Sequence, residues 1–91
     1  MDKKYLDKHA QVIYEYDDQD PLYNMYSGTV TTYYLDGDVY CHEYHKNWLV
    51  YTGETRTYYY GTFDGYLERL SGWNQFYNEY VAALEFAETL K

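Results

Sequence analysis

The sequence predicts an α+β fold, an antiparallel β-meander of four to six strands with one C-terminal amphipathic helix packed on one face of the sheet. Short segments rich in Tyr, Thr and Val are separated by turn signals too closely spaced to leave room for crossover helices, so the strands are expected to be antiparallel. Residues 73–91 change to a helical period. A chain of 91 residues is expected to form one domain, residues 1–91.

The first two strands are expected on either side of an acidic loop. Residues 9–16 alternate as a strand does, and residues 17–21, which read DDQDP, end it because clustered Asp and Pro favour a turn. The residues expected on one face of this strand are Ala10, Val12, Tyr14 and Tyr16. Residues 28–35 form the next strand, and residues 22–27 receive no assignment.

Three further turn signals divide the middle of the chain. Asp36-Gly37 predicts a two-residue hairpin between residues 28–35 and 39–45, because both central positions of such a turn need positive φ. Residues 46–47 turn again into a strand over 48–52. Gly53-Glu54 predicts a second tight hairpin before a strand over 55–63, and Asp64-Gly65 a third. Tyr66–Leu70 after it is compatible with either strand or helix.

The C-terminal segment has the spacing of an amphipathic helix, with Ser71-Gly72 as its N-terminal cap. Such a helix must bury its apolar stripe against one face of the sheet. The residues expected in that stripe are Trp73, Phe76, Tyr77, Tyr80, Val81, Leu84 and Ala87.

The chain contains 16 Tyr, and their alternation sends them to both faces of the sheet. Tyr59 faces opposite to Tyr58 and Tyr60, and Tyr33 opposite to Tyr34. A single terminal helix covers only one face, so several tyrosines on the other are expected to meet water. Exposed Tyr serves either cross-strand pairing or a protein interface.

Acidic residues dominate the charge. The formal net charge is −8, and no Lys or Arg occurs between Lys8 and Lys46. Such a field repels nucleic acid and favours a basic partner, although it also keeps a small protein soluble. We therefore expect no direct binding of nucleic acid, and the absence of a long apolar run predicts no membrane partner.

No motif for catalysis, metal or cofactor binding is present. Cys41, His42 and His45 cluster within CHEYH, but on a strand His42 faces away from both other residues, so they do not converge on one metal. The acidic stretches lack the ligand series of a calcium loop. We expect a protein that is not an enzyme, and the single Cys and lack of a signal sequence predict the cytoplasm.

Residues 72–79 read GWNQFYNE. This stretch resembles part of a helix in small phage-encoded anti-CRISPR proteins, which inhibit Cas-type RNA-guided nucleases. The short length, the acidic composition and a small antiparallel sheet plus helix are similar as well. The resemblance implies an inhibitor that occupies the DNA-binding surface of a nuclease in the host cytoplasm.

The composition and this resemblance together predict a small acidic, Tyr-rich inhibitor that binds a basic protein surface, such as a Cas-type effector or another nucleic-acid enzyme. The alternatives are an immunity protein or antitoxin that neutralises a basic toxin enzyme, and a self-associating structural phage protein that forms a homodimer. The candidate partner-binding residues are Asp17, Asp18, Asp20, Asp36, Asp38, Glu43, Tyr33, Tyr34, Tyr40 and Tyr44.

Overall fold

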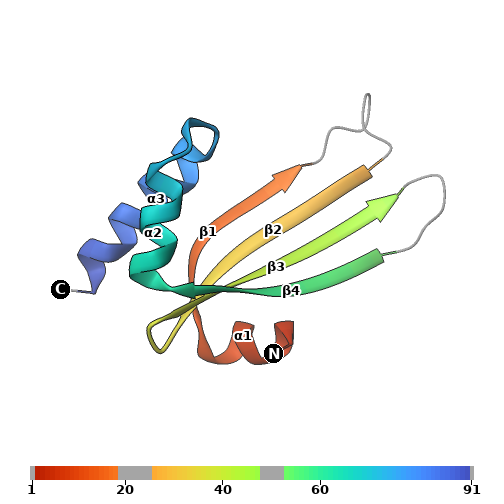
Figure 1. Cartoon of the computed structure of the whole chain (residues 1–91). Helices are drawn as coiled ribbons and strands as arrows, with labels where there is room; N and C mark the ends of the chain where they lie inside the picture. The colour runs from red at the N-terminus through yellow and green to blue at the C-terminus, as the bar shows by residue number, and fades with distance from the viewer. Residues whose placement is uncertain (1, 19–25, 48–52, 91) are drawn as a thin grey trace.

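The computed structural model confirms an α+β fold with an antiparallel sheet and a C-terminal helix, and describes residues 2–18, 26–47 and 53–90. The strands are β1 (Gln11–Asp18), β2 (Tyr26–Leu35), β3 (Asp38–Asn47) and β4 (Gly53–Thr62), and neighbours in sequence are neighbours in the sheet. The helices are α1 (Lys3–His9), α2 (Phe63–Ser71), the short 3-10 turn η1 (Asn74–Phe76) and α3 (Tyr77–Thr89). α2 and α3 lie together beside one end of the sheet, and the strands run on beyond them (Figure 1).

The hairpin predicted at Asp36-Gly37 is confirmed. Both residues have positive φ, 52° and 88°, as the turn requires. The turn sets the register of β2 and β3, with Leu35 opposite Asp38 and Tyr33 opposite Tyr40. Because the pairing alternates strictly from there, the hairpin fixes which side chains of these two strands share a face.

The two faces of the sheet are named here by the helices they contact. The α1 face carries Tyr33, Tyr40 and Tyr59, which lie opposite one another on β2, β3 and β4. The α3 face carries Tyr34, Cys41 and Tyr58, together with Tyr60. Tyr60 shares this face with Tyr58 by ordinary alternation, and a β-bulge follows it, since Tyr40 pairs with Tyr59 but Val39 pairs with Gly61.

The hairpin predicted at Gly53-Glu54 is wrong. Gly53 and Glu54 already belong to β4, where they pair with Lys46 and His45 of β3. An edge strand tolerates Gly53, and pairing with β3 satisfies backbone groups of Gly53 and Glu54. The turn predicted at residues 46–47 is likewise replaced by strand. The strand predicted over 48–52 lies outside the described residues.

The third hairpin, at Asp64-Gly65, is wrong as well, and Tyr66–Leu70 is helical. α2 begins after Thr62, whose side chain accepts a hydrogen bond from Gly65 N at 3.3 Å. Phe63 N donates to Gly37 O at 3.0 Å, which ties the start of α2 to the first hairpin. The Thr cap and the Asp64 carboxylate in the first turn stabilise a helix start, and they outweigh the turn preference of Asp-Gly.

The C-terminal helix is confirmed, but its buried face differs from the predicted stripe. Tyr80 and Ala87 do pack toward the core, beside Ala83 and Phe86. The predicted stripe residues Trp73, Tyr77 and Leu84 are instead 57%, 66% and 42% exposed. The side chains of α3 are apolar nearly all the way round, so periodicity alone did not identify the side that docks. Ser71 and Gly72 do not cap α3 either; Gly72 is the C-cap of α2.

A helix absent from the sequence-based prediction covers the other face. α1 is capped by Asp2, which accepts a hydrogen bond from Tyr5 N, and it buries Leu6 completely. Tyr33 beneath it is 2% exposed, and its hydroxyl donates to Asp7 at 2.5 Å. The expectation that one helix covers one face is therefore corrected: both faces carry a helix.

α1 on one face and α2 with α3 on the other all lie near the Asp36-Gly37 end of the sheet (Figure 1). The buried core cluster contains Val39, two residues past this turn, and Phe63, directly after β4. β1 adds Ile13 through a bulge between Val12 and Tyr14. The bulge places 51% exposed Val12 on the α1 face, away from Tyr14, which corrects the face predicted for it. The core is thus concentrated at one end of a molecule measuring 45 × 30 × 18 Å.

Candidate functional site

The predicted acidic residues do not form one patch. Asp17 lies on the exposed end of β1, where its carboxylate accepts a hydrogen bond from Thr29 Oγ1 at 3.3 Å. Asp36 and Asp38 lie at the hairpin, at the opposite end of the strands. The partners of Asp17 and Asp38 on β2, Thr29 and Leu35, are six positions apart in sequence, so the two ends are about 20 Å apart. Asp18 ends β1, Glu43 lies on the α3 face, and Asp20 lies outside the described residues.

The predicted tyrosines divide into two kinds. Tyr33 is buried under α1, and Tyr34 packs against Phe63 and Phe86 in the core, with ring centroids 5.7 and 5.3 Å away. Their main contacts are therefore internal. Tyr40 and Tyr44 lie half-buried on the α1 face.

Tyr40 contacts a neighbour that the prediction did not include. Its ring lies 5.3 Å from that of Tyr59, which is 60% exposed and donates to Asp38 at 3.0 Å. This cluster joins predicted residues Asp38 and Tyr40 into one small acidic aromatic area on the α1 face.

The half of the sheet farther from the helices is called the open half, and it consists of residues 14–17, 28–30, 43–44 and 55–58. Tyr16 and Tyr58 are 51% and 38% exposed there, both on the α3 face. Glu15 and Asp17 are exposed on the α1 face. Among the open-half residues whose side chains the structure describes, three are acidic, Glu15, Asp17 and Glu43, and one is basic, Arg56.

A groove lies on the α3 face, between the open half of the sheet and the beginning of α3. It consists of two hollows, of about 440 and 160 Å³, which share Tyr60, Phe76 and Glu79. The larger hollow is also lined by Tyr14, Tyr16, Val30, Glu43, Gln75 and Asn78. We call the two together the Glu79 groove.

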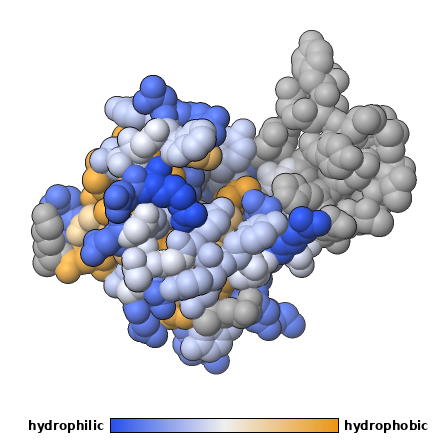
Figure 2. All heavy atoms as spheres, viewed as in Figure 1, coloured by the Kyte–Doolittle hydropathy of each residue, from blue (hydrophilic) through white to orange (hydrophobic). Residues whose placement is uncertain are grey.

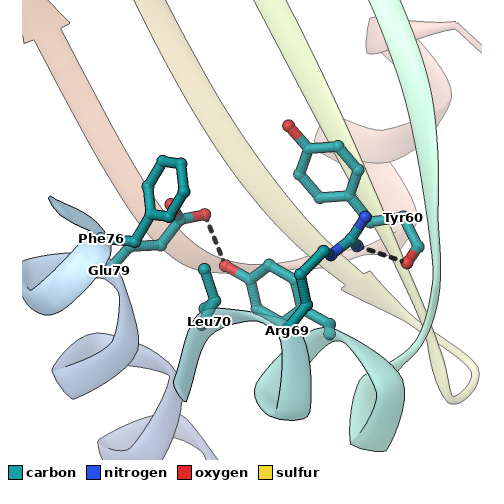
Figure 3. Close-up of a pocket in the computed structure, with 6 residues that line it drawn as sticks. Tyr60, Arg69, Leu70, Phe76 and Glu79 are labelled. Carbon is teal, nitrogen blue, oxygen red and sulfur yellow. Dashed lines mark hydrogen bonds between the residues drawn. The ribbon is translucent and has the colours of Figure 1, made fainter. Parts of the chain in front are cut away.

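Glu79 sits at the junction of the two hollows, and its partners hold it there. Tyr66 donates its hydroxyl to Glu79 Oε1 at 2.6 Å, and Thr32 Oγ1 donates to the same oxygen at 3.4 Å. Both donors are buried, so the bonds fix the carboxylate between α2, β2 and α3. The second oxygen, Oε2, takes part in neither bond. Figure 3 shows the Glu79 carboxylate beside Phe76, with a dashed line to the hydroxyl of Tyr66.

The opposite wall of the smaller hollow carries a guanidinium. The central carbon of Arg69 lies 5.1 Å from the centroid of the Tyr60 ring, and its Nη2 donates to Tyr60 O at 2.8 Å. Figure 3 shows Arg69 extending from α2 toward β4. One face of the Tyr60 ring is thus occupied by a cation of the same chain, which demonstrates how this ring receives a guanidinium.

The groups around Glu79 keep their protons. Burial raises the pKa of Tyr60 and Tyr66 well above the ordinary value, and the hydrogen bond to Glu79 raises that of Tyr66 further. Burial also raises the pKa of the Cys41 thiol to about 11. The Tyr60 and Tyr66 phenols that line the groove are therefore uncharged beside the Glu79 carboxylate at neutral pH.

Of the groove residues that the structure describes, Glu43 was among the predicted site residues and the others were not. Tyr14, Tyr16 and Tyr60 were placed on strands by alternation, and Phe76 was expected in the core. Glu79 appeared only as the last residue of the stretch that resembles anti-CRISPR proteins. Gln75, Phe76, Asn78 and Glu79 from that stretch all line the groove. The sequence signal that could have identified Glu79 is its position within the aromatic run at residues 76–80.

Within residues 2–18, 26–47 and 53–90, no group of three or more His, Cys, Asp and Glu side chains could hold a metal ion. His42 is buried, its Nδ1 lies 3.2 Å from Thr57 Oγ1, and burial lowers its pKa. None of the helices in the described ranges is both long and apolar enough to cross a bilayer. No protein-family model matches the chain, and comparisons with curated proteins and solved structures find no match.

Proposed function

We propose that this protein is a small inhibitor that binds a basic surface on a nucleic-acid enzyme, with a Cas-type effector as the first target to test. The observation that carries the proposal is the open half of the sheet. It exposes Tyr16 and Tyr58 on the α3 face, where Glu43 also lies, and Glu15 and Asp17 on the α1 face. Tyr is a favoured anchor at protein interfaces, and carboxylates beside it favour Arg- and Lys-lined sites.

The exposed aromatic residues extend beyond the sheet. Figure 2 shows hydrophobic residues in separate small areas between hydrophilic ones, including the side where α2 and α3 lie. Trp73, just before η1, and Tyr77, at the start of α3, are among the most exposed large side chains. This mixed surface is typical of a protein that binds partners, since isolated apolar residues within a polar rim supply contact area without causing aggregation.

The inhibitor does not need to imitate the charge of DNA. Duplex DNA of 45 Å, the long dimension of this molecule, carries about 26 phosphate charges, against a net charge of −8 here. Carboxylates alone therefore do not match the phosphate backbone. The tyrosines supply the remaining affinity through desolvated contact and cation–π interaction with the basic partner.

A binding and competition assay tests the proposal. The full chain is immobilised and purified Cas-type effectors are passed over it at low and physiological salt, with and without competing duplex DNA. We expect binding that weakens as salt rises and that excludes DNA from the effector. Charge reversal on the open half, Glu15→Lys with Asp17→Lys, is expected to weaken binding at least tenfold.

The matched control is Glu68→Lys with Glu85→Lys, which makes the same change in net charge on exposed positions of α2 and α3. We expect less than a threefold effect. Equal weakening by both pairs would mean that binding depends on overall charge alone, which would contradict a contact on the open half. Binding of no basic nucleic-acid enzyme by the native chain would contradict the function itself.

A third pair, Asp36→Lys with Asp38→Lys, tests the predicted residues at the hairpin end. Asp38 and the Tyr40–Tyr59 pair form the acidic aromatic area on the α1 face. If the partner covers the whole length of the sheet, this pair weakens binding as the open-half pair does. An unchanged affinity would restrict the contact to the open half.

A further inference from the structure

We propose that the Glu79 groove is a receptor for one arginine side chain of the partner protein. This inference rests on the proposed function, because it specifies how the basic partner is recognised. It assigns the contact to a definite pocket with a definite chemistry.

The shape of the groove fits a side chain that enters from solvent. The larger hollow, of about 440 Å³, lies in the range of about 300–1,000 Å³ typical of ligand pockets. Its walls are aromatic on both sides: Tyr14, Tyr16 and Tyr60 come from the sheet, and Phe76 from η1. Since Tyr16 and Phe76 are 51% and 39% exposed, these rings line an accessible opening.

The charge of the lining selects a cation. Among the residues that the structure describes, no Lys, Arg or His lines the larger hollow, whereas Glu43 and Glu79 both do. Glu43 lies opposite Arg56 across β3 and β4, so we assign the charged contact to Glu79. Tyr66 and Thr32 both bond to Glu79 Oε1, and this leaves Oε2 to meet a ligand. An anion entering this hollow would meet two carboxylates.

Guanidinium suits the groove better than ammonium. It is planar, stacks on aromatic rings and donates to a carboxylate in a fixed fork, whereas ammonium is compact and strongly hydrated. The smaller hollow contains the same interaction within the chain, because Arg69 lies over Tyr60 with its guanidinium carbon 5.1 Å from the ring centroid. A partner's arginine would repeat this arrangement between Tyr16 and Phe76, with Glu79 at the base.

The test uses the isotopically labelled full chain and a blocked tripeptide, acetyl-Gly-Arg-Gly-amide, followed by NMR chemical shifts. We expect saturable shifts at residues of the groove, with a Kd on the order of millimolar, as for a single side-chain contact. The same peptide with citrulline, which is nearly isosteric but neutral, is expected to bind at least fivefold more weakly. A lysine peptide is also expected to bind several-fold more weakly.

Two variants and two controls locate the site. Glu79→Gln removes the charge and keeps an acceptor for Tyr66, and Tyr16→Ala removes one wall at an exposed position, so it leaves the core intact. Each is expected to weaken arginine binding at least fivefold. Glu85→Gln on α3 and Tyr59→Ala on the α1 face make the same chemical changes away from the groove, and we expect no effect.

Equal affinity for the arginine and citrulline peptides, or for arginine and lysine, would overturn the inference. So would unchanged arginine binding in both groove variants. These results are separable from failure of the proposed function. If an effector complex forms through the open half but ignores Glu79→Gln and Tyr16→Ala, the groove assignment alone fails. If the arginine peptide binds but no basic enzyme does, the proposed function fails, whereas the assignment of the groove as an arginine site still holds.

Discussion

Replacing Tyr66 with Phe removes one hydroxyl from the interior and tests the bond that positions Glu79. Tyr66 is 1% exposed, and its hydroxyl donates to Glu79 Oε1 at 2.6 Å. Phe keeps the ring and its contacts with Phe63 and Tyr60. The substitution therefore changes the hydrogen bond while it preserves nearly all of the packing.

The expected loss follows from the type of bond. A hydrogen bond to a charged group contributes about 1.5–3 kcal/mol to the free energy of unfolding. Glu79 is only partly buried, so water can take the place of the hydroxyl at its carboxylate and the lower end applies. We expect a loss of about 1.5 kcal/mol, which for a domain of this size lowers Tm by about 8 °C.

Urea unfolding followed by far-UV circular dichroism measures this loss, with Tyr77→Phe as the matched control. Tyr77 is 66% exposed, and we expect its variant to change the free energy of unfolding by less than 0.5 kcal/mol. A double-mutant cycle with Glu79→Ala should give a coupling energy of about 1 kcal/mol or more. A Tyr66→Phe variant as stable as the native chain, or a coupling energy near zero, would refute the assigned role of this bond.

Three shorter predictions concern the rest of the fold. Leu6→Ala should lower the free energy of unfolding, measured by urea titration, by about 2–4 kcal/mol, because the Leu6 side chain of α1 is fully buried. Leu90→Ala, at a 44% exposed position, should lower it by less than 1 kcal/mol. Gly37→Ala should destabilise the chain by about 1 kcal/mol by thermal unfolding, because Gly37 has φ +88°, whereas Gly72→Ala at a right-handed position should not. Burial and the hydrogen bond to Asp7 raise the pKa of Tyr33 above its ordinary value of 10.0, so its neutral form is favoured in the folded state. The resulting stability is complete below about pH 10 and falls by up to about 1.4 kcal/mol per pH unit above it; a Tyr33→Phe variant that shows the same fall would contradict this.

Much of the sheet was predictable because its signals are local. Asp36-Gly37 determines a turn with positive φ at both positions, and alternation from that turn fixed Tyr33 and Tyr34 on opposite faces. The change to a helical period after residue 72 identified the last helix. Each of these features depends on backbone conformation and on residues close in sequence.

The remaining features were decided by contacts between distant segments. A helix of seven residues such as α1 is unstable alone, and it forms here because Leu6 is buried against the sheet. α2 replaced a predicted hairpin because Phe63 and Tyr66 found places in the core. Because α3 has apolar residues on nearly all sides, the side that packs on the core was determined by its contacts with β1, β2 and α2.

The candidate site divides in the same way. Composition determined that the surface is acidic and rich in Tyr, since a short chain with 16 Tyr and a net charge of −8 cannot bury them all. Only the tertiary structure placed Glu79 among Tyr14, Tyr60 and Phe76, because these residues come from three elements far apart in sequence. A carboxylate becomes a receptor for a cation through the rings around it, and those neighbours are determined by how the helices dock on the sheet.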